Sequence, residues 1–403
     1  MKQLTLIFQA QDTWFFQELR PGNSAWLRSM FPPPARAFEG AVRALMQQAC
    51  GRADALAGNL RMAGPWPCID DHQQWQRLYP WPLHIVEQPG VAVDSATPLR
   101  ATLLPSATAT WCDMGRVRLP TLPAQCAQDT GKAWQAPQQT WLARDDFIQL
   151  LADSQASVKP IKLEDYVTRE ARLGIARVAQ TALSDAGALY QTEHLRIQPP
   201  LGFAITLRVS PDKASGLADL AQEQYLTQLE QHIGSGLQVR LGAEGRMAQV
   251  SVLPDVTLDE AILPERFAGQ NVILVATSAM DFNGNWLPQE FALDPGTPAG
   301  QAQSWSGVFH ASGDRFNLRL WSAVIGKRVL EGSAIPGRVD DAGRKPDSAR
   351  LGQGARALVP AGSVWFGQLL HGEFKRLART RLGIGKKLGR GEFALATWKE
   401  GEA

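Results

Sequence analysis

The first part of the chain combines a short apolar run with one long amphipathic segment. Residues 2–9 are apolar and partly β-branched, which predicts a β-strand. Three prolines at positions 32–34 follow, and proline suits the first turn of a helix because its ring fixes φ. Phe38, Val42 and Leu45 then recur at helical spacing, so a helix is expected over residues 35–50.

The central part of the chain predicts further strands around a second amphipathic helix. Residues 173–180 and 188–196 are separated by the polar turn Ser184-Asp185-Ala186-Gly187 and predict a hairpin. The pattern continues with a strand over 202–209, a helix over 216–232, and a strand pair over 237–241 and 247–253. The order β, α, β, β, α, β is that of the ferredoxin-like fold, which also underlies the RNA-recognition module.

Residues 51–145 interrupt this pattern, with ten prolines and several tryptophans. They are expected to form an insertion with short strands, not an independent domain, and a short helix should follow over 145–153. Beyond residue 257 the expected strands lie at 272–276, 316–324, 328–330, 363–369 and 392–397, with a loop over 333–354. We therefore predict an α+β protein with two ferredoxin-like, RRM-like domains (1–255 and 256–403), long insertions and a C-terminal glycine-rich loop.

The composition is that of a folded intracellular protein. The chain has 403 residues, 44% hydrophobic and 20% charged, which suits about two globular domains. Its four cysteines show no CxxC spacing, and no apolar stretch is long enough for a signal or a membrane span. We expect a cytoplasmic protein without a membrane segment. The net charge is only +2, yet residues 374–391 contain seven basic residues and no acidic one.

Enzyme signatures are weak. The six histidines form no metal-binding spacing, and no GxSxG elbow occurs, so no catalytic residue, metal or cofactor is expected.

The glycine-rich loop at 383–391 lacks a Walker ending and misses GxGxxG by one residue. Its glycines would let backbone N–H groups approach RNA phosphates. The RNA-binding candidates there are Gly383, Gly385, Lys386, Lys387, Gly389, Arg390 and Gly391. A mobile surface turn with solvated lysines is the alternative.

The predicted central hairpin is the second basic feature. It carries Arg169, Arg172 and Arg177, with Ile175 on the same strand. An arginine-bearing hairpin that projects from a sheet can wedge between bases and hold phosphates. An ordinary surface hairpin is the alternative. Most of the 13 tryptophans are expected to pack beneath the long connections and not to stack on bases.

Five segments in order resemble a known family, the Cas-five-like RAMP subunit of type III-B CRISPR effectors, which is the third subunit of the Cmr complex. They are Asp12-Thr13-Trp14-Phe15-Phe16 with Arg20-Pro21; Phe31-Pro32-Pro33-Pro34 with Gly40-Ala41-Val42-Arg43; Glu170-Ala171-Arg172-Leu173-Gly174-Ile175 with Gly187-Ala188-Leu189-Tyr190; Val359-Pro360-Ala361-Gly362-Ser363-Val364-Trp365; and the closing glycine loop. The chain departs from the family pattern at Gln17, at Arg390, where an aromatic residue is usual, and at Glu331-Gly332-Ser333-Ala334, which replaces a tryptophan-bearing segment.

This resemblance implies a non-catalytic subunit that caps a crRNA-guided complex and holds the crRNA 5′ tag. The implied protein partners are the large Cas-ten-type subunit and a backbone Cas-seven-like subunit. Arg43, Arg172, Arg177, Lys386, Lys387 and Arg390 should then lie along one RNA path, with Arg390 adding a phosphate contact. The other readings are a RAMP endoribonuclease that uses Tyr190 or His194, the equivalent subunit of another type III subtype, and a scaffold that binds protein only.

Overall fold

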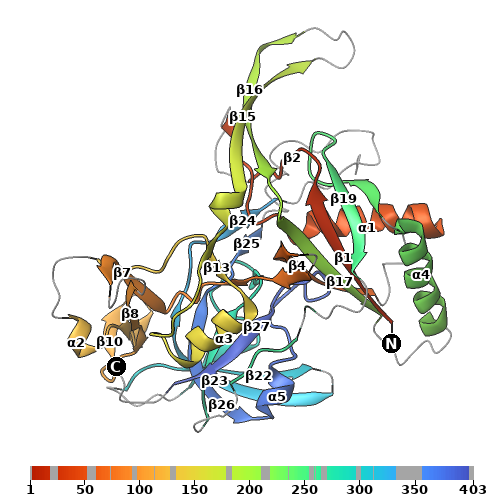
Figure 1. The fold of residues 1–403 in the computed structure, drawn as a ribbon. Coiled ribbons are helices and arrows are strands. Elements are labelled where there is room, and N and C mark those ends of the chain that lie inside the picture. Colours follow the sequence, from red (N-terminus) through yellow and green to blue (C-terminus); the bar gives the residue numbers. More distant parts are fainter. Residues whose placement is uncertain are drawn as a thin grey trace.

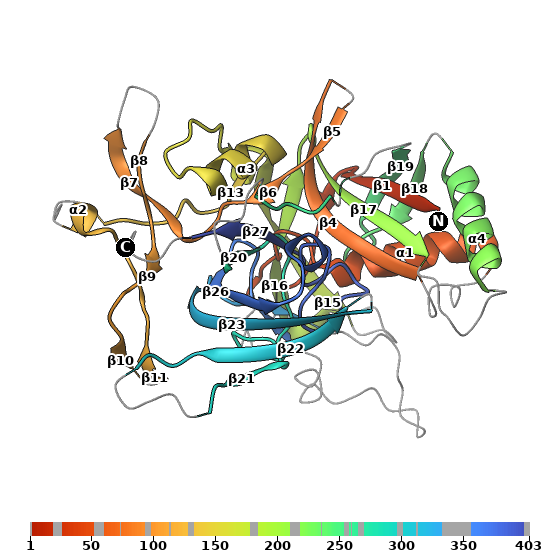
Figure 2. The ribbon, with the colours of Figure 1, turned by 90° about the horizontal axis from the view of Figure 1, so that it is seen from below.

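The computed structural model describes residues 2–18, 26–51, 60–72, 74–92, 98–112, 114–127, 133–177, 184–209, 218–234, 236–253, 258, 260–264, 270–295, 301–311, 313–332 and 356–398. Two six-stranded sheets dominate these residues. One lies beside two long helices, and a β-ribbon projects from the region near it (Figure 1). The other sheet lies below it in Figure 1, next to a group of short strands (Figure 2).

The N-terminal sheet is antiparallel and has the order β18-β19-β1-β17-β4-β5. Its elements are β1 (Gln3–Ala10), α1 (Ala35–Cys50), β4 (Leu60–Asp71), β5 (Gln74–Arg77), β17 (Leu201–Val209), α4 (Ala218–Ile233), β18 (Leu237–Arg240) and β19 (Met247–Leu253). The succession β1-α1-β4-β17-α4-β19 is a split βαβ arrangement. The expected first strand and both long helices are therefore confirmed, α1 with the predicted bounds.

Side-chain alternation explains why these helices cover one face of the sheet. Leu4, Leu6 and Phe8 of β1 point into the core shared with α1, whereas Ile7 points to the opposite face. Helix α1 ends at Gly51, which adopts the left-handed conformation with φ 68° that glycine tolerates best.

Strand β4 was not predicted, because its segment contains Pro65 and Pro67 and proline weakens a ladder. The structure accommodates Pro65 by a register shift. Ala63 pairs with Thr206 and Trp66 with Ala204, so Pro65 lies in the irregularity between them. Strand β4 thereby becomes a partner of β17 in the main sheet.

The central hairpin is confirmed, but it is longer than predicted. It consists of β15 (Val167–Arg177) and β16 (Ser184–Ile197), and the predicted turn residues 184–187 belong to β16. Short strands β2 (Thr13–Trp14) and β3 (Trp26–Leu27) pair with β16, so the hairpin forms a sheet of its own. Figure 1 shows it projecting from the body of the molecule.

The C-terminal sheet has the order β21-β22-β23-β26-β20-β27. Its strands are β20 (Asn271–Ala276), β21 (Phe291–Leu293), β22 (Trp305–Ala311), β23 (Asp314–Val324), β26 (Val364–His371) and β27 (Phe393–Thr397). Strands β24 (Val329–Glu331) and β25 (Arg356–Leu358) pair separately. In the described residues after 258, only the four-residue α5 (Phe374–Leu377) is α-helical. The mixed α+β class is observed, whereas a second ferredoxin-like domain is not confirmed. The expected loop at 333–354 lies entirely outside the described residues.

The first part of the predicted insertion at 51–145 supplies β4 and β5 of the N-terminal sheet. The segment between β5 and β15, which we call the insertion from here on, packs on the C-terminal sheet although it interrupts the N-terminal one. Its elements are β6 (Tyr79–Pro80), β7 (Ile85–Ala92), β8 (Pro98–Thr102), β9 (Leu104–Pro105), β10 (Thr110–Cys112), β11 (Gly115–Val117), β12 (Pro120–Thr121), α2 (Ala124–Ala127), β13 (Thr140–Leu142), α3 (Arg144–Ala152), β14 (Ile161–Lys162) and a 3-10 helix (Leu163–Tyr166). Phe147 and Leu150 of α3 share a core with Ile273 and Val275 of β20. Val272 and Leu274 face a separate core on the other side of the sheet, so β20 is buried on both faces.

A buried ionic cluster joins the two large sheets. Glu392, just before β27, accepts hydrogen bonds from the indole of Trp66 (2.8 Å) on β4 and from the guanidinium of Arg77 (3.0 Å) on β5. Arg381 donates to the second Glu392 carboxylate oxygen at 2.8 Å. Arg77 also lies over the Trp66 ring, 4.2 Å from its centroid, and donates to the Leu258 carbonyl at 2.9 Å.

Within the described part of the chain, no helix is long and apolar enough to cross a membrane.

Removal of the Glu392 carboxylate should destabilise the protein strongly. The Arg77 side chain is only 5% exposed, so Glu392→Ala would leave a buried guanidinium without its carboxylate. We expect a loss of about 3–5 kcal/mol in the free energy of unfolding. The control is Glu373→Ala, because the 70% exposed Glu373 side chain pairs with Arg376 on the surface. That change should cost less than about 1 kcal/mol. Urea unfolding measures both, and equal losses would contradict the buried role of Glu392.

Candidate RNA interface

The glycine-rich loop owes its glycines to close packing. Gly383, Gly385, Gly389 and Gly391 all have φ between 75° and 83°, in the left-handed region that favours glycine. A Cβ atom on Gly389 would lie 1.7 Å from the carbonyl oxygen of Gly64, and one on Gly391 would lie 2.0 Å from that of Leu382. The sequence-based explanation, approach of the backbone to an anion, is therefore not needed for these two positions.

The loop is docked on strand β4 of the N-terminal sheet. The Met62 N–H donates to the Lys387 carbonyl at 2.9 Å. Arg381 donates to the carbonyls of Met62 (3.0 Å) and Lys386 (2.6 Å) and thus clamps the loop to the strand. On the other side the Ile384 N–H donates to the Asp281 carbonyl at 2.8 Å. The alternative of a mobile turn is at odds with these contacts.

Arg390 anchors the loop from inside and is not available to an RNA phosphate. Its side chain is 4% exposed, and its guanidinium donates to Asp281 at 3.2 Å and to Glu331. Burial raises the pKa of Glu331, and the Arg390 charge opposes that rise. The expectation that Arg390 adds a phosphate contact is thus corrected. Arg390 and Glu331, two departures from the family pattern, form one ion pair with each other.

The two lysines of the loop keep a surface position. Lys387 is exposed, and the Lys386 side chain is 37% exposed with its Nζ 3.8 Å from Glu290. Contacts with Met62, Arg381 and Arg390 hold the backbone around these lysines. The two lysine side chains therefore extend from a backbone of fixed conformation.

The hairpin has one apolar face and one polar face. Leu173, Ile175 and Leu189 are 74%, 57% and 58% exposed, and Ile175 pairs directly with Leu189 across the ladder. Gly174 lies against the Tyr190 ring on the opposite face. Arg177 ends β15, and its side chain lies outside the described residues.

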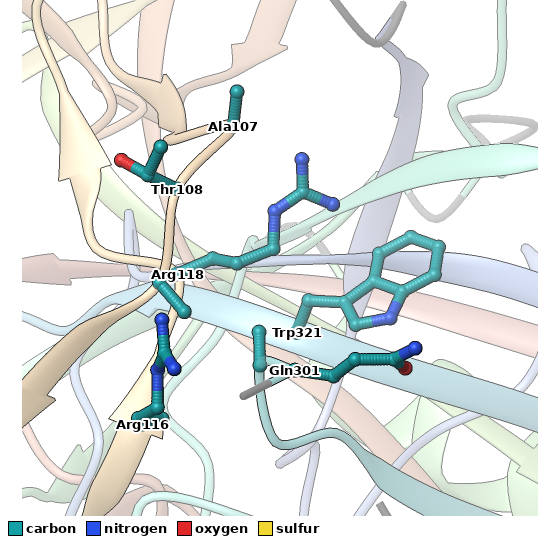
Figure 3. Close-up of a pocket in the computed structure, with 8 residues that line it drawn as sticks. Ala107, Thr108, Arg116, Arg118, Gln301 and Trp321 are labelled. Carbon is teal, nitrogen blue, oxygen red and sulfur yellow. The ribbon is translucent and has the colours of Figure 1, made fainter. Parts of the chain in front are cut away.

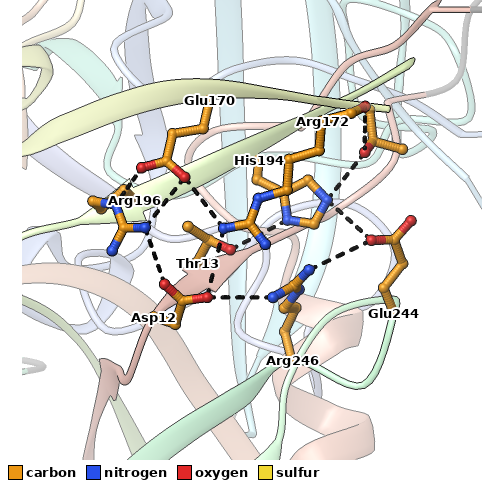
Figure 4. A network of polar contacts seen from close by, with 9 residues as sticks. Asp12, Thr13, Glu170, Arg172, His194, Arg196, Glu244 and Arg246 are labelled. Atoms are coloured by element: carbon orange, nitrogen blue, oxygen red, sulfur yellow. Dashed lines mark hydrogen bonds and ion pairs between the residues drawn. The ribbon is translucent and has the colours of Figure 1, made fainter. Parts of the chain in front are cut away.

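The predicted hairpin arginines have carboxylate partners. Arg169 donates to Glu193 and, at 3.3 Å, to the Ser29 carbonyl. Arg172 belongs to a network at the base of the hairpin that unites three acidic and three basic side chains (Figure 4). Asp12 lies 3.1 Å from Arg196, 3.5 Å from Arg172 and 3.3 Å from Arg246. The positive charge at the hairpin base is therefore largely compensated.

Pairing with arginines lowers the pKa values of two carboxylates in this network. The hydrogen bond from Arg196 lowers the pKa of Glu170, and Arg172 adds to the effect. At Asp12 burial is the largest single influence and raises the pKa, but the combined effect of Arg196, Arg172 and Arg246 outweighs it, so the pKa of Asp12 is lowered. Both groups are thus held as carboxylates at neutral pH.

His194, one of the residues considered for RNA cleavage, is fully buried beside this network. Its Nε2 lies 3.0 Å from Glu244 and 3.1 Å from Thr192, its Nδ1 lies 3.2 Å from Thr13, and its ring stacks on Phe15. Burial lowers the pKa of His194, and Arg246 lowers it further. In this position His194 ties β16 to its neighbours and has no access to a ribose hydroxyl.

The segment after β1 connects the hairpin to the loop. Asp12 binds the hairpin arginines, and six residues later Glu18 pairs through its backbone with Glu331, the partner of Arg390. Arg36 at the start of α1 hydrogen-bonds Glu331 through its backbone. Arg43 lies about 10 Å further along the helix axis and pairs with Glu39 at 2.7 Å. No contact in the described residues joins Arg43 to the loop.

Sequence reasoning missed the acidic members of these clusters, Asp12, Asp281 and Glu331 among them. Asp12 and Glu331 did lie in segments compared with the family, but nothing in the sequence paired them with arginines far away in the chain. In the residues that the structure describes, no group of three or more histidines, cysteines and acidic residues is placed to hold a metal ion.

A family model described as "CRISPR-associated protein (Cas_Cmr3)" matches residues 6–398. No curated protein matches the sequence. One similar solved chain belongs to "Cryo-EM structure of the Type III-B Cmr-beta bound to cognate target RNA", with 12% identity, a TM-score of 0.39, and 98% of this chain and 99% of that chain covered. A second belongs to "Crystal structure of Csm1-Csm4 cassette in complex with pppApA", with 10% identity, a TM-score of 0.30, and 78% and 94% covered. With scores this low, the family match alone carries the assignment.

The close approach of Gly389 to β4 predicts a position-specific effect of alanine. Gly389→Ala and Gly284→Ala both place a side chain at φ near 80°, which costs about 1–2 kcal/mol. Space is open around Gly284, whereas Gly389 would meet the Gly64 carbonyl. We expect only Gly389→Ala to lift the loop from β4, which hydrogen exchange at the Met62 amide would report as faster exchange. Equal exchange in the two variants would contradict the docking of the loop.

The network at the hairpin base predicts a stability difference that depends on pH. The folded-state pKa of Glu170 lies below its ordinary value of 4.5, so its contribution is fully present above that value and is lost as the pH falls through the lowered pKa. The melting temperature of the wild type should exceed that of Glu170→Gln at pH 7, and the gap should narrow as the pH falls below the ordinary value of 4.5 and through the lowered pKa. Glu164→Gln, at an exposed position, is the control. A gap that does not narrow as the pH falls below 4.5 would contradict the assignment.

Proposed function

The chain belongs to the Cas_Cmr3 family of CRISPR-associated proteins, and from this we propose that it is the non-catalytic crRNA-binding subunit of a type III effector. In this role it holds the 5′ tag of the crRNA at one end of the complex. It contacts the large Cas-ten-type subunit and the first Cas-seven-like backbone subunit.

The observation that carries this proposal is the rigid presentation of Lys386 and Lys387. Backbone contacts to β4, the Arg381 clamp and the buried Arg390 fix the loop before any ligand binds. A fixed pair of ammonium groups loses little conformational entropy at the backbone when it binds a phosphate chain. Such contacts neutralise phosphates, release counterions and make affinity depend on salt.

The projecting hairpin supplies a second contact of a different kind. Its exposed aliphatic face, with Leu173, Ile175 and Leu189, can pack on bases that are splayed out of a stack. Because Arg169 and Arg172 are already paired with carboxylates, their share in phosphate binding is smaller than that of the loop lysines. Binding is therefore proposed to combine charge at the loop with apolar contact at the hairpin.

The burial of His194 favours the binding role over RNA cleavage. A general base for a ribose hydroxyl must lie within hydrogen-bond reach of it, about 3 Å. His194 is enclosed by Thr13, Thr192, Glu244 and Phe15, and these neighbours occupy both ring nitrogens and one ring face.

Loss of the two loop lysines should weaken retention of crRNA. In the reconstituted complex, Lys386→Ala/Lys387→Ala is expected to lower the salt dependence of crRNA affinity, with a slope reduced by about 1.4 for two lost phosphate contacts on a single strand. Complex assembly should remain normal, since neither side chain is part of the core. The control is Lys159→Ala/Lys162→Ala, which removes two exposed charges beside β14.

Two results would overturn the proposal. One is unchanged crRNA retention in the loop double variant across a salt series, with the complex fully assembled. The other is metal-independent cleavage of repeat RNA by the purified chain that is lost in His194→Ala, which would make the protein an endoribonuclease.

A further inference from the structure

A pocket lies where the insertion meets the C-terminal sheet, and it shares no residue with the loop or the hairpin network. It has a volume of about 530 Å³ and is lined by Ala107, Thr108, Arg116, Arg118, Gln301 and Trp321, among others (Figure 3). A volume of this size falls within the range of small-molecule sites, about 300–1,000 Å³. Figure 3 shows the two arginines on the insertion side and Trp321 and Gln301 on the other.

The pocket is positively charged. Arg116 and Arg118 are two positions apart along β11 and the residue after it, so they point to the same side of the strand. None of the eight lining residues is acidic. Arg118 donates through Nε to the Ser106 carbonyl at 2.7 Å, which directs its side chain. Arg116 Nε is buried without a hydrogen-bond partner among the described residues, so one donor beside the pocket is left unsatisfied.

Two tryptophans accompany these arginines. Trp321 of β23 forms one wall, and its ring is held edge-on by Trp398, with centroids 6.0 Å apart and planes at 83°. Trp111 pairs with Arg116 across the β10–β11 hairpin, so their side chains lie on the same face, and Trp111 is 75% exposed. The indole of Trp111 is therefore accessible from solvent on the face that carries Arg116.

We propose that this pocket binds a nucleotide, with its phosphate on Arg116 and Arg118 and its base against Trp321. Thr108 and Gln301 provide polar groups for the edge of the base. An acidic peptide would use the two cations but would leave the indole wall without a counterpart. The exposed Trp111 beside the pocket can stack a second base, which favours a single-stranded RNA over a free nucleotide. This site goes beyond the crRNA role proposed above and does not depend on it.

Titration of the full-length chain tests the site. The probes are a fluorescein-labelled tetrauridylate and unlabelled AMP, followed by anisotropy and by tryptophan fluorescence. Arg116→Ala/Arg118→Ala should weaken binding of the tetranucleotide at least tenfold and lower its salt slope by about 0.7, because the two arginines share one phosphate. Trp321→Leu should weaken binding about 5- to 150-fold with the salt slope unchanged, since a stacking contact is lost and no charge is. Lys159→Ala/Lys162→Ala is the charge-matched control.

A crosslink on the wild-type chain keeps the test independent of folding defects in the variants. RNA that carries 4-thiouridine should crosslink to the peptides around Trp111 or Trp321, also in the Lys386→Ala/Lys387→Ala variant. Failure of the loop proposal and failure of the pocket proposal are thereby distinguishable.

Competition by AMP would identify a free nucleotide as a ligand of the same site, and its absence would identify an RNA strand. Crosslinks elsewhere with unchanged affinity of both pocket variants, or preferential binding of polyglutamate, would overturn the proposal.

Discussion

The ionic cluster around Glu392 is the interaction on which the arrangement of the molecule depends. One carboxylate receives hydrogen bonds from Trp66 and Arg77 of the N-terminal sheet and from Arg381 beside the glycine-rich loop. Three donors on one buried acid are needed, because a carboxylate removed from water is costly unless its oxygens are well paired. The same contacts place the loop on β4. Sheet-to-sheet packing and loop position are therefore consequences of one site.

Charge compensation also explains how a protein that we propose to bind RNA can be nearly neutral. Arg172 and Arg196 are matched by Asp12 and Glu170, and Arg390 is matched by Asp281 and Glu331. These arginines stabilise the hairpin base and the loop. Lys386 and Lys387 lie at the surface of that loop on a backbone that is held in place. Local geometry, more than the net charge of +2, sets where an anion can bind.

The insertion both packs against the C-terminal sheet and lines the pocket, and its prolines and tryptophans predicted neither role. It covers one face of the C-terminal sheet through Phe147 and Leu150, which makes it part of the core. At its other end the β10–β11 hairpin presents Trp111 and Arg116 on one face, next to the pocket that contains Trp321. If the pocket holds a nucleotide, the proposed RNA contacts of the protein lie at two separate places, the glycine-rich loop and this pocket.

The sequence by itself determined the local elements, because hydrophobic periodicity and turn residues act over a few positions. Strand β1, helices α1 and α4, the central hairpin and buried β20 all followed from such patterns, and the ordered motifs indicated the family. Tertiary structure alone decided what Arg390 does, since burial and pairing with Asp281 and Glu331 depend on segments far apart in the chain. It also decided that Pro65 fits into β4, that His194 is enclosed, and that Arg118 and Trp321 share a pocket. These positions and contacts depend on residues far apart in the chain, so no local sequence pattern could predict them.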